Sequence, residues 1–332
     1  MKKSGLAAGI GGVIGMCILI LDGKTALLGA QAGIDQCLKA VIPALFPFFL
    51  LSNLLVGSLW GVSLPLLSPA ARLFGLPKGG ESLLVSGFLG GYPIGVQNVA
   101  RLYSLGQLEK KDACRLISFL GQPGPAFLFG MVAPMLDDPQ KAWILWGILL
   151  YGAFLVSVLT HGTDRDISLV RGKAISLSDA MSASLSAMGK VCGWVILFQV
   201  VLAFLRRWVL WYLDDAGIAV VGGFLELSGG CLLLGNVQPE SLRFLIACGI
   251  LSFGGLCVTM QTASVLGKLS VLPYLVGKLI QTAFCLLLAG AYIFRLWWLP
   301  VILTGSIFLV RRKKGVAFSE KTLYTKGKPV GG

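Results

Sequence analysis

The stretch Ser86–Gly95, Ser-Gly-Phe-Leu-Gly-Gly-Tyr-Pro-Ile-Gly, places four glycines and one proline inside a chain whose other segments are long and apolar. Glycine and proline are the poorest helix formers, so this stretch predicts a break in a membrane helix. Backbone that is not helical is tolerated at membrane depth only where protein buries it or where it lines a polar cavity. We therefore expect a re-entrant hairpin whose turn contains Gly90, Gly91, Tyr92 and Pro93.

A second interruption follows at Gly222–Gly230, with the sequence Gly-Gly-Phe-Leu-Glu-Leu-Ser-Gly-Gly. Each interruption begins with Gly-Phe-Leu and is followed about 30 residues later by a Ser-Phe pair, at Ser118 and at Ser252, so the two copies lie about 135 residues apart. Matching interrupted segments in two halves of a chain are the sequence signal of a transporter binding site. Chance is the alternative, because Gly-Phe-Leu is common in apolar sequence. Whether the copies are inverted depends on the number of spans between them.

The composition is that of an integral membrane protein. Hydrophobic residues make up 56% of the 332 residues and charged residues only 13%, with a mean hydropathy of +0.83, whereas soluble domains carry roughly 25% charged residues. The length leaves room for about eight to ten hydrophobic segments of roughly 20 residues each. We therefore predict an all-α polytopic membrane protein with re-entrant or broken helices and an internal repeat, expected to be inverted.

The net charge of +13 would suggest nucleic acid as a partner of a soluble protein. Here the basic residues gather at segment ends and in the tail, as in Arg311–Lys314, and the positive-inside rule accounts for that pattern. It predicts a cytoplasmic C-terminal tail, with the lipid bilayer and not nucleic acid as the partner.

Metal, disulfide and enzyme chemistry are not indicated. No two of the eight cysteines are spaced Cys-x-x-Cys, and a single histidine, His161, makes an imidazole metal site improbable. The chain has no His-Glu-x-x-His motif and no Gly-x-Ser-x-Gly nucleophile motif. We expect neither an enzyme nor a cofactor, apart from a coupling proton or Na⁺.

Glu226 is the strongest candidate for a functional side chain. It lies between two glycine pairs in an apolar segment, and an ionisable group within a membrane span is expensive. It could bind a coupling cation or relay a proton; the alternative is an interfacial segment that leaves Glu226 in water. Gln97, Asn98 and Gln261 could hold a polar ligand without a charge, or could simply form hydrogen bonds between helices.

Several separated motifs occur in an order that resembles the sporulation integral membrane protein family of the YlbJ type, which belongs with the nucleoside-recognition or gate domain proteins. The motifs are Pro43–Phe48, Ser86–Gly95, Gly124–Gly130, Glu226–Gly230 and Ser252–Gln261. The resemblance implies a fold like that of concentrative nucleoside transporters. It also implies export of dipicolinic acid from the mother cell across the outer forespore membrane. One departure is Gly121-Gln122-Pro123, where a Ser- or Asn-rich stretch is expected.

On the basis of this resemblance and of the repeat, we predict four parts of the chain. They are an N-terminal membrane helix (1–24), a first gate-like repeat (25–175), a second gate-like repeat (176–310) and a basic cytoplasmic tail (311–332).

An anionic solute needs positive partners. Further helix breaks are expected at Gln122–Pro125 and at Gly254–Gly255. Backbone amides freed at the breaks at Gly90–Gly91, Gly124 and Gly254–Gly255 supply the positive partners first. Lys190, in mid-helix after a run of small residues, is the second choice and is expected to be buried. Arg101 and Arg115 are expected among the lipid headgroups. The predicted substrate- or ion-binding set is Gly90, Gly91, Tyr92, Pro93, Gln97, Asn98, Gly124, Lys190, Glu226, Ser228, Gly254, Gly255 and Gln261.

Three functions remain open at this point. The first is a transporter of a small anionic solute in a bacterial, mother-cell-derived membrane. The second is a transporter of a nucleoside or nucleobase, which would need neutral hydrogen-bonding groups. The third is a scaffold that transports nothing and recruits sporulation membrane partners, or a second copy of the chain.

Overall fold

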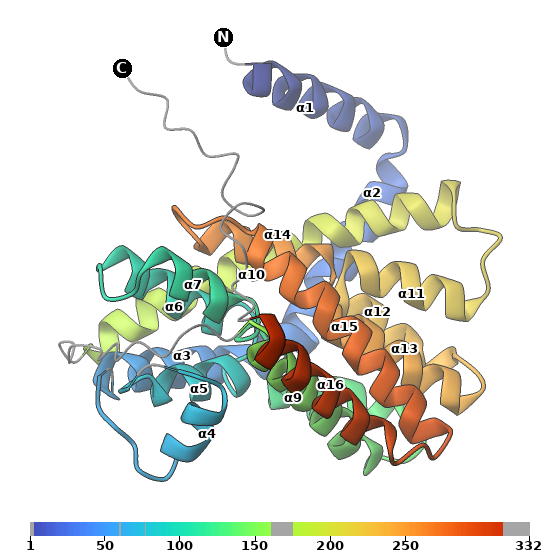
Figure 1. Cartoon of the computed structure of the whole chain (residues 1–332). Coiled ribbons are helices and arrows are strands. Elements are labelled where there is room, and N and C mark those ends of the chain that lie inside the picture. The colour runs from blue at the N-terminus through green and yellow to red at the C-terminus, as the bar shows by residue number, and fades with distance from the viewer. Residues whose placement is uncertain (1–2, 60, 77, 161–174, 315–332) are drawn as a thin grey trace.

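A computed structural model describes residues 3–59, 61–76, 78–160 and 175–314. His161 and most of the predicted tail lie outside the described residues, and the cytoplasmic side of the tail stays a prediction. The described chain is built of helices (Figure 1). They are α1 Lys3–Leu21, α2 Gly23–Gln36, α3 Ile42–Leu59, α4 Ser68–Leu73, α5 Glu81–Phe88, α6 Ile94–Ser104, α7 Lys110–Ile117, α8 Pro125–Phe127, α9 Lys141–Leu159, α10 Leu177–Trp208, α11 Asp215–Leu225, α12 Leu227–Leu233, α13 Glu240–Phe253, α14 Gly255–Val265, α15 Leu272–Ile293 and α16 Leu299–Lys314.

Five of the described helical segments are long and apolar enough to cross a membrane: Gly23–Leu59, Lys141–Leu159, Leu177–Trp208, Glu240–Val265 and Leu272–Ile293. Five shorter apolar helices accompany them, at Gly9–Leu21, Pro125–Met135, Asp215–Leu225, Leu227–Asn236 and Leu299–Leu309. Long apolar helices satisfy every backbone hydrogen bond internally, which is what a bilayer demands. The prediction of an all-α polytopic membrane protein is confirmed.

The same order of elements occurs twice along the chain. The first series is a long helix (α2–α3), a hairpin (α5–α6), an interrupted helix (α7–α8) and a long helix (α9). The second series is α10, the hairpin α11–α12, the interrupted helix α13–α14 and α15. α8 continues through a π-helical turn at Leu128–Val132 and a 3₁₀ turn at Ala133–Met135. This order is the one that the predicted repeat requires.

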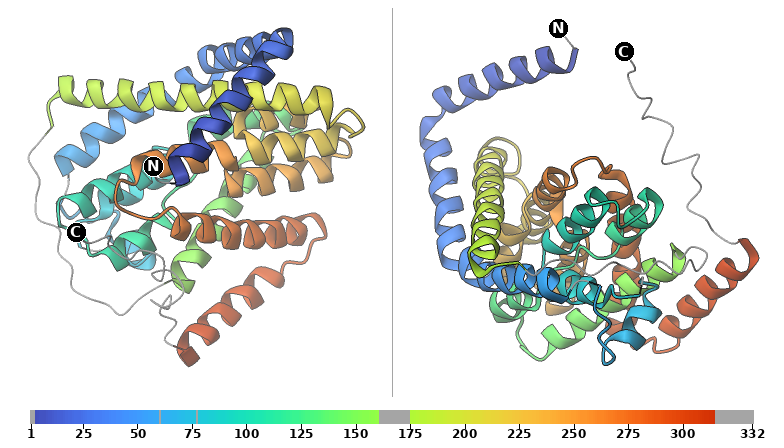
Figure 2. Two further views of the ribbon diagram at one scale, coloured as in Figure 1. Left: turned by 90° about the horizontal axis from the view of Figure 1, so that it is seen from above. Right: turned by 90° about the vertical axis from the view of Figure 1, so that its left-hand side faces the viewer.

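Proline does not break the first long helix. The chain stays helical across Pro47, and a π-helical turn at Cys37–Val41 precedes Pro43. Proline lacks the N–H that would close a regular turn, and a widened turn accommodates it. The ribbon changes direction between α2 and α3 (Figure 2), so the helix is bent there but not broken.

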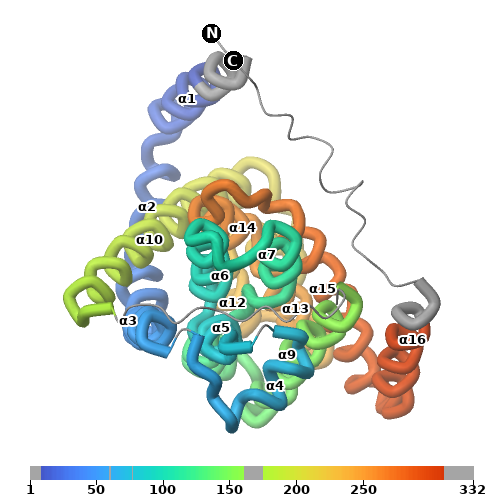
Figure 3. The backbone as a smooth tube through the Cα atoms, turned by 60° about the vertical axis from the view of Figure 1, so that its left-hand side comes forward, coloured from blue at the N-terminus to red at the C-terminus, as the bar shows by residue number. Residues whose placement is uncertain are grey.

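α2 and α3 lie beside α10 along one flank of the molecule (Figure 3), while α1 extends away from the other helices (Figure 2). α2 approaches α10 closely because its contact face carries glycine. A Cβ placed on Gly33 would lie 2.7 Å from the Cα of Ile196, and one on Gly29 would lie 2.8 Å from the Cα of Val200. Small residues allow this kind of close helix packing in a bilayer.

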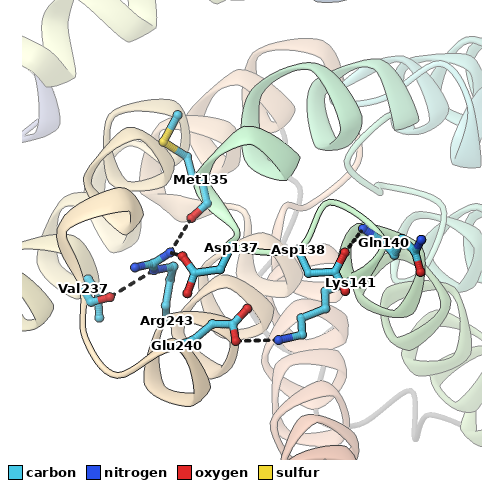
Figure 4. Close-up of polar contacts among 8 residues, drawn as sticks. All are labelled: Met135, Asp137, Asp138, Gln140, Lys141, Val237, Glu240 and Arg243. Carbon is cyan, nitrogen blue, oxygen red and sulfur yellow. Dashed lines mark hydrogen bonds and ion pairs between the residues drawn. The ribbon is translucent and has the colours of Figure 1, made fainter.

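Polar contacts join the two series between the chain that follows α8 and the start of α13 (Figure 4). Arg243, near the start of α13, donates to the carbonyls of Met135 and Val237 at 3.0 Å each and pairs with Asp137. Lys141, at the start of α9, pairs with Glu240. The segment that follows α8 is therefore fixed to the segment that precedes α13.

Candidate functional site

The four interruptions of the helices meet in the interior. A Cβ placed on Gly91 in the first hairpin would lie 3.2 Å from the backbone nitrogen of Gly124 in the first interrupted helix. A Cβ on Gly255 in the second interrupted helix would lie 2.9 Å from the carbonyl oxygen of Gly223 in the second hairpin. Gly91 and Gly255 also have positive φ angles, 79° and 81°, which other residues rarely adopt. These approaches explain why glycine occupies the breaks.

Tyr92 connects the two pairs of interruptions. Its side chain is buried, and its hydroxyl donates to the carbonyl oxygen of Leu251, 2.9 Å away, at the end of α13. A Cβ on Gly254 would lie 3.1 Å from the same hydroxyl oxygen. The turn of the first hairpin thus rests against the break of α13–α14.

A cavity of about 30 Å³ lies where these segments meet. Its lining is Val41, Leu45, Tyr92, Pro123, Gly124, Phe127, Val191, Val195, Glu226, Leu227, Ser228, Val258 and Gln261. Five residues of the predicted set are therefore brought together, from both halves of the sequence. The cavity has room for a water or a small ion, and pockets for organic ligands are about 300–1,000 Å³. A larger solute would require the lining to move.

Glu226 occupies the break between α11 and α12. Its side chain is buried, at 1% exposure. The alternative prediction, an interfacial segment that leaves Glu226 in water, is therefore wrong. One carboxylate oxygen, Oε1, accepts from the backbone N–H of Ser228 at 3.0 Å. The other, Oε2, accepts from Gly229 N–H at 2.6 Å. Its extended backbone (φ −137°) ends one helix and begins the next.

Two glutamines complete the surroundings of this carboxylate. The Nε2 atoms of Gln36 and Gln199 donate to Glu226 Oε2 at 2.8 Å and 3.1 Å, and Gln199 Nε2 also lies 2.6 Å from Gln36 Oε1. The close packing of α2 on α10 brings the two amides together. Neither glutamine was in the predicted set, although Gln199 is the one amide side chain in α10. Charge-assisted hydrogen bonds of this kind are about twice as strong as neutral ones.

Two further cavities lie on either side of the central one along α10. A groove of about 890 Å³ is lined by Gln199 and Arg206 of α10 together with Gln36, Lys39 and Gly229. A cavity of about 120 Å³ is lined by the α10 residues Ala183, Ser186, Ala187, Lys190 and Val191, and by Pro93, Gln97, Gln261, Ser264 and Val265. Val191 and Gln261 line both this cavity and the central one.

The remaining predicted residues divide into two groups. Pro93 and Gln97 line the 120 Å³ cavity. Gly90 packs against Ser52, and Asn98 is buried away from the three cavities, with no hydrogen-bond acceptor for its Nδ2 among the described residues. The prediction that Lys190 is buried is wrong, because its side chain is exposed beside the 120 Å³ cavity. Of the small residues before it, Ala180 and Ser184 are buried, and Ser184 accepts a hydrogen bond from Asn53 of α3, whereas Ala183 and Ser186 face the cavity with Lys190.

A second buried polar cluster lies behind Tyr92. The amides of Gln122 and Gln281 exchange hydrogen bonds of 3.0 Å and 2.7 Å, and Lys278 Nζ donates to Gln281 Oε1 at 3.0 Å. Lys278 is fully buried in mid-helix, at 0% exposure. Sequence analysis missed it, although it is the one charged residue within α15. The Gln122 that departs from the expected family pattern is part of this cluster.

The fold and the site define a class: a multi-pass, all-α membrane protein whose interrupted helices and hairpins meet around a buried carboxylate. The chain is similar to a sporulation integral membrane protein of the YlbJ type. It is 27% identical over 319 residues to the sporulation integral membrane protein YlbJ of Bacillus subtilis (strain 168), a match that covers 81% of this chain and 76% of that protein. No family model and no solved structure matches the chain.

Proposed function

We propose that this chain is a membrane transporter for a small anionic solute. The observation that carries the proposal is the meeting of four helix interruptions around one cavity that contains Glu226. Broken helices meeting in the interior are where transporters hold substrates, and a buried ionisable group among membrane helices is a functional candidate by default. The three cavities along α10 support the proposal further. The residues of α10 that line them run from Ala183 to Arg206, a length of about 35 Å at about 1.5 Å per residue. This is enough to cross a bilayer core of about 30 Å.

In this proposal Glu226 carries the coupling ion, a proton or Na⁺. Two like charges about 4 Å apart repel by about 4 kcal/mol at an effective dielectric constant of about 20, which is about a thousandfold in affinity. An anionic solute therefore binds beside Glu226 when the carboxylate is neutralised. Solute binding and ion binding would then be linked, with no catalytic step and no further cofactor.

For the solute we propose dipicolinic acid, exported from the mother cell across the outer forespore membrane during sporulation. The support is the relative, which is named as a sporulation integral membrane protein, together with the family resemblance of the motifs. A nucleoside or nucleobase is the second candidate. The observation that favours it is the neutral hydrogen-bonding character of Tyr92, Ser228 and Gln261 in the cavity lining, which includes no lysine or arginine among the described residues.

We also propose that the two series of helices are inverted copies of one unit. Their elements follow the same order, and the hairpin α5–α6 lies at the left of Figure 1 whereas α11–α12 lies at the right. Cysteines introduced at the exposed Ser104 and Asn236 should therefore react with a membrane-impermeant thiol reagent from opposite sides of the membrane. Reaction from one side would contradict inversion.

The experiment that tests the transport proposal is uptake of dipicolinate by the purified chain in liposomes, with nucleosides in parallel. We expect Glu226→Gln and Gly91→Leu to abolish uptake, because one removes the carboxylate that carries the coupling ion and the other forces a side chain against Gly124. Gly147→Leu is the matched control, since a Cβ on Gly147 has nothing within 4 Å.

The outcomes separate the candidates. Uptake of nucleosides and not of dipicolinate would replace the anionic solute with the second candidate. Wild-type protein that is folded and moves neither solute would contradict the transport proposal. Free replacement of Glu226 and of the glycines would favour a scaffold.

A further inference from the structure

Lys278 is a buried basic residue that the cavity lining does not explain. Its ammonium lies 3.3 Å from the hydroxyl of Tyr92 and 3.0 Å from Gln281 Oε1. It also lies 5.0 Å from the ring centroid of Tyr92 and 5.9 Å from that of Tyr274. All these partners are neutral, and the ion pairs of the described residues do not include Lys278. A lysine kept at 0% exposure without a carboxylate is costly in a membrane protein.

The position of this charge relates it to the central cavity. Tyr92 lines the cavity and also receives the hydrogen bond from Lys278, so a single side chain separates the ammonium from the cavity. The lining itself carries one charged residue, Glu226, and no cation among the described residues. In a protein interior, charges are poorly shielded and act over longer distances than in water. A protonated Lys278 would therefore add a field that favours an anion in the cavity once the coupling ion has neutralised Glu226.

Lys278 is better suited to this role than the other basic residues near the cavities. Lys190 is exposed beside the 120 Å³ cavity. Lys39 forms an exposed ion pair with Asp35, 3.2 Å away, at the groove. The charges of Lys190 and Lys39 are exposed and are therefore screened. The side chain of Lys278 is buried, so its charge would be screened much less.

We propose that Lys278 is the residue that makes the central cavity select a carboxylate-bearing solute over a neutral one of the same shape. This inference rests on the proposed function. The charge of Lys278 acts on the solute through space, and its hydrogen bond to the Tyr92 hydroxyl positions that side chain in the cavity lining. Lys278 is thus a specificity-determining residue. Loss of the charge, with the packing kept, should weaken selection of the anion and spare the neutral solute.

The test compares uptake of pyridine-2,6-dicarboxylate with uptake of its uncharged diamide in liposomes that contain the full chain. We expect the ratio of diacid to diamide uptake to fall about tenfold or more in Lys278→Gln, the scale of one charge in a poorly shielded interior. Lys278→Arg should keep the ratio within about threefold, because it keeps the charge. Lys268→Gln, a change of the same charge at an exposed loop position, is the control and should leave the ratio unchanged.

A second variant tests the same inference if Lys278→Gln fails to fold. Gln281→Glu places a carboxylate where the amide oxygen lies 3.0 Å from Nζ, so it neutralises the ammonium without removing it. It should lower the ratio in the same direction, which a purely structural lysine would not predict. An unchanged ratio in folded Lys278→Gln or in Gln281→Glu would overturn the inference and leave transport of the diacid intact. Wild-type protein that moves neither compound would overturn the proposed function and this inference with it.

Discussion

Glu226 accepts four hydrogen bonds, two from backbone N–H groups and two from amide side chains. The two amides come from α2 and α10, far from Glu226 in the sequence. Because Gln199 also bonds Gln36, each member of the trio orients the others. The carboxylate is thus held in one position by partners from three helices.

Gln199→Leu should lower the stability of the folded protein. The substitution leaves Gln36 Oε1 without its donor and removes one donor from Glu226, and an unsatisfied buried polar group costs about 1–3 kcal/mol. The measurement is a thermal melt in detergent, beside Gln140→Leu, whose side chain is exposed. Equal melting temperatures for the two variants would argue against the trio as a stabilising unit.

At this scale the sequence identifies charged residues better than their partners. Glu226 and Lys278 are both isolated charges in apolar helices, and the same reasoning that selected Glu226 would have selected Lys278. Lys190 was preferred because small residues precede it, but small residues line a cavity as readily as a helix contact. Gln199 gave no signal beyond an amide in an apolar run, and Gln36 lies among charged residues. Their contact depends on how two helices that are distant in the sequence pack.

The helix breaks, unlike the partners of the buried charges, could be predicted from the sequence. The interruptions in Ser86–Gly95, in Gly121–Pro125, at Glu226 and at Gly254 were all predicted, because glycine and proline act on their own backbone. Their meeting was not predictable, since the hydrogen bond from Tyr92 to Leu251 joins residues 159 positions apart. Such contacts depend on the packing of the whole bundle.

Gly33→Ala should separate α2 from α10 and disturb the contact between Gln36 and Gln199. Its Cβ would lie 2.7 Å from a backbone atom of α10, and backbone cannot turn aside as a side chain can. We expect a lower melting temperature, although alanine in a helix is otherwise favoured over glycine by about 0.5–1 kcal/mol. Gly147→Ala, in an open position of α9, is the control and should be neutral or stabilising. A stabilised Gly33→Ala would show that the helices are not closely packed there.

At the scale of the molecule, α10 forms a common wall of the three cavities. It contributes Arg206, Leu202 and Gln199 to the groove, and Val195 and Val191 to the central cavity. The third cavity is lined by Lys190, Ala187, Ser186 and Ala183 of the same helix. Residues three or four apart lie on one face of a helix, so these side chains form a single stripe. If the chain is a transporter, this stripe lines the path of the solute.

The stripe predicts which face of α10 meets water and solute. Val195 is 2% exposed and lines the central cavity, whereas Leu197 is 51% exposed on the outer face of the same helix. We expect a water-soluble, negatively charged thiol reagent to stop dipicolinate uptake by Val195→Cys, and solute added beforehand to slow that loss. Leu197→Cys should behave like wild type treated with the same reagent, which sets the baseline for the native cysteines. If Leu197→Cys and not Val195→Cys were inactivated, the path would run over the outer face of α10, and the cavities would be spaces within a structural core.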